Sequence, residues 1–184
     1  MRRLWIWFIA AVVGLGVYPS SYSQSTSLHS SKFPRTLSPE YEDGGFKHAK
    51  SPSDLLLNAL LATSEAKDAE PELKGLSREK LRGLFRVVEV QLGPKDEQDF
   101  VAVGSGPLSG TDSDWFWILR VKSGEAKVLL FLNGLQVSIL KHQTDGYSDI
   151  RGDWATAGYS GWGIFKFNGQ EYKLFRSKSR ENKD

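Results

Sequence analysis

The chain has 184 residues, of which 40% are hydrophobic and 25% are charged, a composition typical of a globular protein. It contains no cysteine, which excludes disulfides, thiolate metal sites and thiol catalysis. The formal net charge is +2, from 24 basic and 22 acidic residues. No stretch reaches the roughly 20 apolar residues that a transmembrane helix needs, so the sequence excludes a multi-pass membrane protein.

The first 23 residues have the pattern of a secretory signal peptide. Residues 1–3 form a positively charged start, and the apolar run over 4–18 that follows is too short for a comfortable membrane span. Ser21 and Ser23 are the small residues that signal peptidase requires, which predicts cleavage before Gln24. An uncleaved membrane anchor is the alternative interpretation.

Cleavage at this position changes the charge of the chain. It removes two basic residues and no acidic one, which leaves 22 basic residues against 22 acidic ones. The excess positive charge therefore belongs to the signal, and long-range attraction to nucleic acid is not indicated. We expect a secreted or periplasmic protein with no nucleic-acid partner and no transmembrane segment after cleavage.

A flexible leader and two helices are predicted next. Residues 24–50 are rich in Ser, Pro and Gly and show no hydrophobic periodicity, which predicts a flexible segment. The run Ser51-Pro52-Ser53-Asp54 has the residues of a helix N-terminus and precedes a leucine-rich stretch. This predicts that the folded domain starts at residue 51 with a helix to about Lys67. Ser77-Arg78-Glu79-Lys80 predicts a second short helix.

From Phe85 onward the hydrophobic period changes from 3.6 to 2, which predicts strands. The expected strands span 85–91, 100–104, 114–122, 127–132, 135–141, 155–159, 163–167 and 171–175. Asn133-Gly134 and Asn168-Gly169 are predicted as two-residue hairpin turns, because this dipeptide accepts positive φ at both positions.

The order of these elements predicts an α+β fold. One or two N-terminal helices are expected to pack on an antiparallel, meander-like twisted sheet or a partly closed barrel. The single domain is expected to cover residues 51–176. Residues 177–184 are predicted to form a charged disordered tail.

Four stretches, at 88–92, 99–103, 146–150 and 165–174, carry a resemblance. They resemble exported bacterial β-rich proteins in which FG-GAP-like acidic turns recur together with a C-terminal Y/F-x-F-x-G-x-x-Y hairpin. The resemblance covers roughly half of the chain. It implies an exported β-rich module and transfers no catalytic residue to this sequence.

The acidic turns of such repeats can hold calcium, so both were considered as metal sites. Calcium takes six to eight oxygen ligands, usually from several acidic residues at alternating positions. The turn at 145–149 lacks a middle Asp or Asn, and the turn at 96–99 lacks the glycine that closes such a loop. We therefore expect solvated turns, with no metal and no cofactor.

The catalytic inventory of the predicted domain is small. His142 is its only histidine, so a Ser-His-Asp arrangement would depend on that residue alone, and no serine lies in a nucleophile elbow. A carboxylate pair from Asp112, Asp114, Asp149 and Asp153 is the alternative that would make an extracellular glycan hydrolase. The thin inventory favours a protein that is not an enzyme.

Aromatic residues are the remaining functional signal. They could form a platform for a glycan or a protein partner, although packing in the core is the competing interpretation. The candidate ligand-binding residues are Trp115, Trp117, Tyr147, Trp154, Tyr159 and Trp162. The expected function is an exported, non-catalytic binding or interaction module of the envelope or extracellular space. The alternatives are the glycan hydrolase and a structural envelope component without a small ligand.

Overall fold

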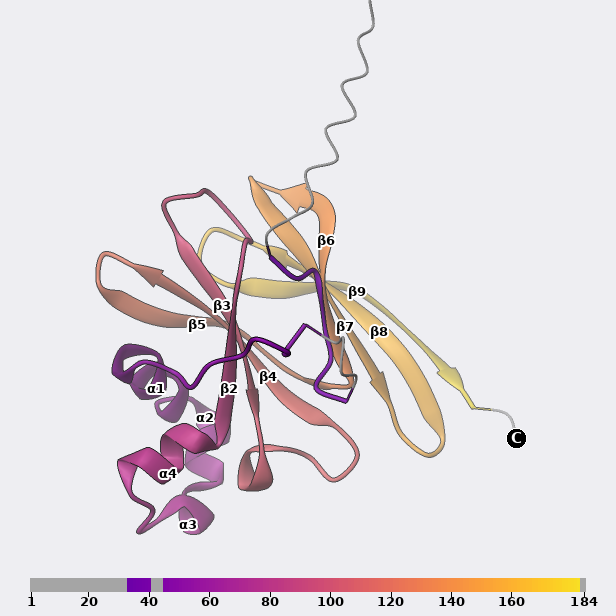
Figure 1. Cartoon of the computed structure of the whole chain (residues 1–184). Coiled ribbons are helices and arrows are strands. Elements are labelled where there is room, and N and C mark those ends of the chain that lie inside the picture. The colour runs from indigo at the N-terminus through magenta and orange to yellow at the C-terminus, as the bar shows by residue number, and fades with distance from the viewer. Residues whose placement is uncertain (1–32, 41–44, 183–184) are drawn as a thin grey trace, which may run out of the picture. The chain divides into compact units, whose positions relative to one another are not determined.

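The computed structural model describes residues 33–40 and 45–182, which all lie in one compact unit of the chain (Figure 1). The predicted signal peptide and part of the predicted leader lie outside the described residues. Within the described ranges, no helix is both long enough and apolar enough to cross a membrane.

The described residues form two antiparallel sheets and four short helices, which confirms the α+β prediction. The four-stranded sheet has the order β2-β3-β4-β5, and the five-stranded sheet has the order β1-β6-β7-β8-β9. The strands are β1 (Thr36–Leu37), β2 (Phe85–Val90), β3 (Gln98–Gly104), β4 (Asp114–Lys122), β5 (Glu125–Gly134), β6 (Gln136–Thr144), β7 (Tyr147–Ala155), β8 (Tyr159–Phe167) and β9 (Tyr172–Glu181). Consecutive strands pair as an antiparallel meander, as predicted, but the meander is divided over two sheets and forms no closed barrel among the described residues.

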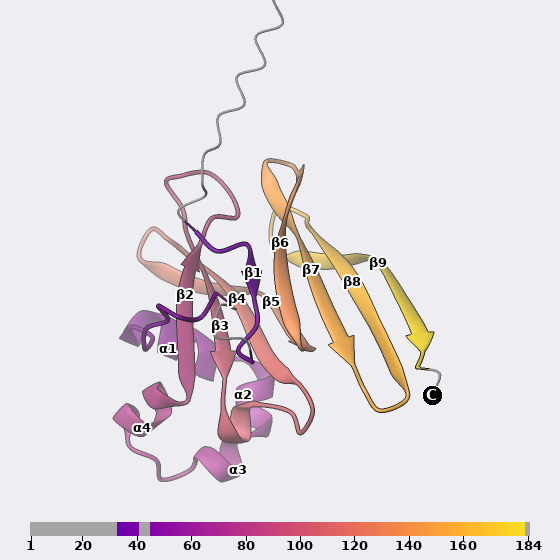
Figure 2. The ribbon, with the colours of Figure 1, turned by 45° about the vertical axis from the view of Figure 1, so that its right-hand side comes forward.

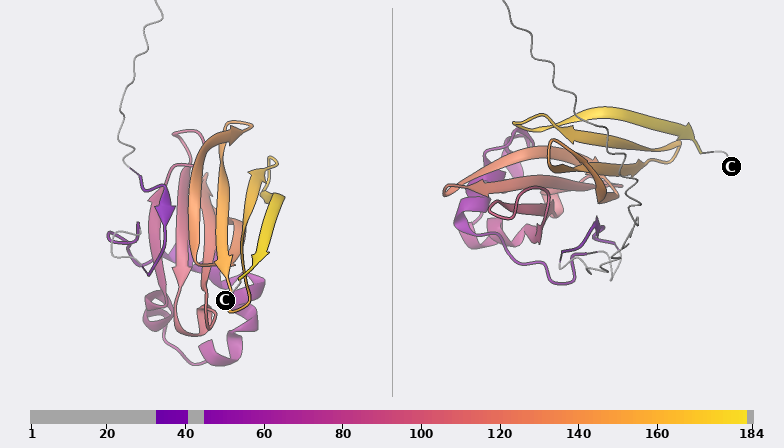
Figure 3. Two further views of the ribbon diagram at one scale, coloured as in Figure 1. Left: turned by 90° about the vertical axis from the view of Figure 1, so that its right-hand side faces the viewer. Right: turned by 90° about the horizontal axis from the view of Figure 1, so that it is seen from above.

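The helices lie on the side of the four-stranded sheet that faces away from the other sheet (Figure 3). They are α1 (Asp54–Leu61), α2 (Ser64–Asp68), α3 (Glu70–Leu73) and α4 (Arg78–Gly83). Three of them begin with a side-chain cap, in which a hydroxyl oxygen accepts a hydrogen bond from a backbone N–H group of the first turn. The capping residues are Ser53, Thr63 and Ser77. The second predicted helix is confirmed as α4. The first is divided, because Thr63 caps a new helix where one continuous helix to Lys67 was expected.

The folded domain begins earlier than residue 51. β1 pairs with β6, and Leu37 is fully buried between the sheets. Phe46 is also buried, and Lys50 pairs with Val87 at the edge of β2. These two buried side chains and the backbone pairing tie the segment to the domain, which the polar composition of the predicted leader did not reveal.

The domain also ends later than predicted. β9 extends to Glu181 through a stretch predicted as a disordered tail, and every residue after Tyr172 in this strand is exposed. Its order comes from pairing with β8 along its length, with one register shift between Leu174 and Arg176. The strand therefore lacks the buried alternation by which a strand is found in a sequence. The prediction of a disordered segment is therefore wrong for residues 177–181. The predicted strand at 155–159 is also wrong, because residues 156–158 form the turn between the end of β7 at Ala155 and the start of β8 at Tyr159.

The turns differ from the Asn-Gly prediction. Asn133-Gly134 joins no hairpin, since β5 and β6 belong to different sheets. Gly134 is required there by space, because a Cβ atom would lie 2.5 Å from the carbonyl oxygen of Asp153. The two-residue hairpins with positive φ at both positions are Ser123-Gly124 and Asp145-Gly146. At Asn168-Gly169 a turn does form, but only Gly169 has positive φ.

Two hydrophobic clusters stabilise this arrangement. One fills the space between the sheets, and the other lies between the four-stranded sheet and the helices. Part of the five-stranded sheet is covered by neither. Figure 2 shows β8 and β9 extending past the four-stranded sheet, so both of their faces reach solvent there.

Candidate functional site

Two of the six candidate aromatic residues belong to the helix-side core. Trp117 is completely buried, and Trp115 lies beside it with ring centroids 6.2 Å apart. Both rings contact Phe131 of β5. A ligand cannot reach Trp117, so these two residues do not form an exposed platform.

Tyr147 lies at the opposite end of β7 from the other aromatic candidates, between the sheets. Its ring contacts Phe167 at a centroid distance of 4.4 Å and is covered by the guanidinium of Arg120, also at 4.4 Å. Its hydroxyl donates to Glu97 over 3.3 Å. Burial, the first cause, and this hydrogen bond raise the pKa of Tyr147, so the phenol stays neutral. Its role is in packing and in a buried polar network.

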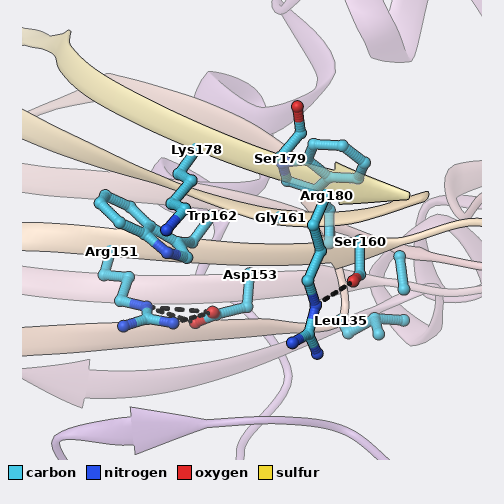
Figure 4. Close-up of a pocket in the computed structure, with 11 residues that line it drawn as sticks. Leu135, Arg151, Asp153, Ser160, Gly161, Trp162, Lys178, Ser179 and Arg180 are labelled. Carbon is cyan, nitrogen blue, oxygen red and sulfur yellow. Dashed lines mark hydrogen bonds and ion pairs between the residues drawn. The ribbon is translucent and has the colours of Figure 1, made fainter. Parts of the chain in front are cut away.

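The other three candidates lie on β7 and β8. Trp154 and Trp162 line a hollow of about 450 Å³ in the uncovered part of the sheet (Figure 4), whereas Tyr159 is 53% exposed at the start of β8 and does not line it. We call this hollow and its rim the β7–β9 surface. It is lined by Leu135, Arg151, Asp153, Trp154, Ala155, Ser160, Gly161, Trp162, Lys178, Ser179 and Arg180.

Trp162 is held between side chains from both neighbouring strands. The guanidinium of Arg151 lies 5.3 Å from its ring centroid, and that of Arg176 lies 5.5 Å away. Asp153 accepts two hydrogen bonds of 3.0 Å from the Nε of Arg151, which fixes the orientation of that guanidinium. Two cations are therefore positioned over an aromatic ring before any ligand arrives.

Trp154 projects from the other face of the sheet. Strand register pairs Asp153 with Trp162 and Trp154 with Gly161, and side chains at consecutive positions point to opposite faces. A Cβ atom on Gly161 would lie 2.5 Å from Trp154 Cζ2, so the indole lies directly over the glycine. Trp154 also lines a second hollow of about 300 Å³ with Phe165 and Leu174. The two tryptophans therefore do not share one platform.

One face of β9 carries three cationic side chains. Arg176, Lys178 and Arg180 pair with Ile164, Trp162 and Ser160, so all three side chains lie on the face that carries Trp162. Figure 4 shows Arg151, Trp162 and Lys178 at one end of the hollow and Arg180 with Ser160 at the other. Sequence reasoning missed these cations because it treated the segment as a tail. Their alternation at every second position was the available signal.

The candidate catalytic histidine contacts a buried carboxylate. His142 Nδ1 lies 2.8 Å from Asp149 Oδ2, and Thr144 donates to Asp149 Oδ1 over 2.8 Å. His142 is itself largely exposed, next to an irregularity in the pairing of β6 with β7. In the described part of the chain, no hydroxyl is hydrogen-bonded to its other ring nitrogen. The arrangement accordingly lacks an aligned nucleophile.

The carboxylates considered for glycoside hydrolysis fall into two places. Asp112 and Asp114 lie before and at the start of β4, and burial raises the pKa of Asp114. Asp149 and Asp153 lie in β7. The oxygens of Asp149 accept from Thr144 or contact His142, whereas both oxygens of Asp153 accept from Arg151. Each of the β7 carboxylates is thus engaged by its neighbours.

Two acidic residues of the turn at 96–99 take part in a network of buried ion pairs. Asp99 is fully buried, contacts Arg120 Nε at 2.8 Å and accepts from the backbone N–H groups of Leu92 and Gly93. Glu97 pairs with Arg120 at 3.0 Å and with Lys122 at 2.8 Å. Burial acts to raise the pKa of Glu97, but the Lys122 hydrogen bond and the Arg120 charge outweigh it and hold that pKa below its usual value.

Neither acidic turn gathers the ligands that a metal ion requires. Among the described residues, no group of three or more His, Asp or Glu side chains is arranged to hold a metal ion. The turn at 145–149 instead closes the β6–β7 hairpin, with positive φ at Asp145 and Gly146.

Comparisons of this chain with protein-family models, with curated proteins and with solved structures find no match.

Proposed function

We propose that this protein is an exported, non-catalytic binding module whose ligand is a glycan held at the β7–β9 surface. The observation that carries the proposal is the alignment of Arg151, Trp162 and Arg176 across three strands beside the 450 Å³ hollow. A hollow of this volume is in the range of small-molecule sites. Export is supported by the signal-like N-terminal sequence.

The rigidity of the site supports binding. Side chains that are ordered before association lose less conformational entropy when the ligand arrives. Arg151 is fixed by Asp153 and by Trp162, and Arg180 Nε donates to Ser160 over 3.2 Å. These groups lie on paired strands rather than on a loop, which holds their mutual geometry.

A glycan is favoured over a protein partner by the composition of the surface. Lysine and aspartate are depleted at protein interfaces, whereas this hollow has both Lys178 and Asp153 in its lining. Aromatic side chains offer large rigid contact area with little entropy loss, which suits the apolar face of a sugar ring. A non-catalytic role is supported by the engagement of Asp149 and Asp153 with neighbouring side chains.

Acrylamide quenching of tryptophan fluorescence tests this proposal. The full chain would carry Trp5→Phe and Trp7→Phe, so that emission comes from Trp115, Trp117 and the two surface tryptophans. We expect a quenchable component from Trp154 and Trp162, and its protection by at least one of polygalacturonate, hyaluronate, dextran and laminarin. Trp117 is the internal reference, because it is fully buried.

Trp162→Phe is the matched variant, since it keeps an aromatic ring and removes one emitter. Its quenchable component should fall, and ligand protection should weaken by more than it does in Tyr159→Phe, whose side chain lies outside the hollow. Unchanged quenching with all four polysaccharides would contradict the proposal and favour a structural component without a small ligand.

A further inference from the structure

We infer that the ligand is an acidic linear polysaccharide whose carboxylate or sulfate groups bind the cations of β9. This inference rests on the proposed function and adds the ligand's charge and its direction on the molecule. Arg176, Lys178 and Arg180 form a row on one face of β9, and Arg151 extends the row to β7 next to Trp162.

The spacing of the row suits a repeating anion. Residues two apart on a strand project from the same face about 7 Å apart, so the three β9 cations form an even ladder. The strand pairs only with β8, and all three residues are exposed along its length. A linear polymer can therefore lie along the strand and contact each cation in turn.

The three β9 cations of this row lack acidic partners. Among the described residues, none of Arg176, Lys178 and Arg180 forms an ion pair with a carboxylate, whereas Lys173 on the same strand pairs with Glu171 at 2.9 Å. Arg176 contacts the ring of Trp162, and Arg180 donates to a serine hydroxyl. Anionic ligands would thus meet positive charge that the protein itself does not neutralise.

The surroundings of Trp162 favour a sugar polymer over a nucleic acid. Proteins that bind single-stranded nucleic acids stack bases on open aromatic faces. Here Trp162 is flanked by two guanidinium groups, and Trp154, the other aromatic residue that lines the hollow, projects from the opposite face of the sheet. The lining therefore offers a single ring beside several cations rather than a series of rings for successive bases. Arginine forks are suited to carboxylate and sulfate-like oxygens, which acidic glycans supply.

A competing explanation concerns the edge of the sheet. Lysine and arginine on an edge strand prevent pairing with another chain, and β9 is such an edge. This explanation accounts for cations on β9. It does not account for Arg151 on β7, which lies inside the sheet and is fixed by Asp153 beside Trp162.

The test compares polygalacturonate with its fully methyl-esterified form, which has the same backbone without the charge. Binding to the full chain is measured by calorimetry from about 50 mM to about 200 mM salt. With three phosphate-like contacts, counterion release predicts an affinity loss of about 20-fold over this range for the acidic polymer. Single-stranded DNA of mixed sequence is the nucleic-acid control.

The charge variant is Arg176→Gln/Lys178→Gln/Arg180→Gln, which should bind polygalacturonate at least about tenfold more weakly at low salt and lose most of its salt dependence. The matched control is Lys67→Gln/Lys74→Gln/Lys80→Gln, which removes the same charge from exposed positions on the helices. It should bind within about twofold of the unmodified chain, because distant exposed charges are screened. Circular dichroism checks that both variants are folded.

Three results would overturn the inference. Equal affinity for polygalacturonate and its methyl ester would show that ligand charge does not contribute to binding, while leaving the proposed glycan function intact. DNA binding as tight as polygalacturonate binding would indicate a general polyanion site. No binding to either polymer, together with aggregation of the charge variant, would assign the cations to protection of the sheet edge. The salt dependence of the unmodified chain decides the question if the charge variant does not fold.

Discussion

The two pairs of tryptophans on the strands have different surroundings. Trp115 and Trp117 lie on β4 in the middle of a sheet that helices cover, and their rings pack on Phe131. Trp154 and Trp162 lie on β7 and β8 where the sheet extends past its neighbour, and they line a hollow. The same residue type is thus a core residue or a surface residue according to which layer covers its strand.

Charged residues show the same contrast. Arg120 is buried between the sheets with Glu97 and Asp99, so its charge is balanced inside the protein. Arg176, Lys178 and Arg180 lie on the uncovered strand without acidic partners among the described residues. A buried charge must be paired to be tolerated, whereas an exposed one is available to a ligand.

Replacing a tryptophan in each region should separate these roles most clearly. Trp117→Ala removes a fully buried ring and should destabilise the protein by about 3–5 kcal/mol. Trp162→Ala removes a partly buried ring with two cation contacts and should cost about 1 kcal/mol. Urea denaturation of both variants measures the difference. Equal losses would contradict the assignment of Trp162 to the surface.

The buried ion network gives the next largest expected effect. Arg120→Ala leaves Glu97 and Asp99 buried without their main cation and should destabilise by about 3–5 kcal/mol. Arg151→Ala breaks a partly exposed pair with Asp153 and should cost at most about 1 kcal/mol. The two variants can be compared by thermal unfolding at neutral pH. A small loss for Arg120→Ala would mean that the carboxylates find other partners.

The pH dependence of stability should reflect the same network. The pKa of Glu97 is held below its usual value in the folded protein, so the unfolded state takes up a proton first as pH falls. The stabilisation is therefore complete above the unfolded pKa and is lost as pH falls through the lower folded value. Denaturation between about pH 6 and pH 3 should show this decline. Glu97→Gln should reduce its slope, whereas Glu79→Gln on the exposed face of α4 should leave it unchanged.

Much of the covered region was predictable because local sequence and tertiary structure agree there. The hydroxyl of Ser77 caps α4 as its sequence indicates, and β4 has the predicted bounds 114–122. α4 shows a clear local capping pattern although it buries no residue completely, and β4 combines its apolar pattern with a buried centre. The uncovered region was less predictable, since β9 has no buried face after Tyr172 and its order depends on β8.

The candidate site shows the same limit. Trp162 could be named from the sequence, but nothing local distinguishes it from Trp117, because burial depends on the layer above the strand. The cations of β9 join the site only once that strand is paired with β8. The contact of His142 with Asp149 likewise depends on a hairpin at Asp145-Gly146 that the sequence analysis treated as an acidic turn.

The last prediction concerns Gly161, where β8 lies in close contact with its neighbours. A Cβ atom there would lie 2.5 Å from both the carbonyl oxygen of Lys178 and the ring of Trp154. Gly161→Ala must shift backbone as well as a ring, so it should destabilise by about 1–3 kcal/mol and displace Trp154.

Gly158→Ala is the control, because its Cβ would meet no atom within 4 Å in the neighbouring turn. It should change stability by no more than about 0.5 kcal/mol. If Gly161→Ala left both stability and Trp154 quenching unchanged, the uncovered strands would be too loosely held to position a ligand. Rigidity at Gly161 is therefore a condition for the proposed site, because exposed strands must hold Arg151, Trp162 and Lys178 in place without a covering layer.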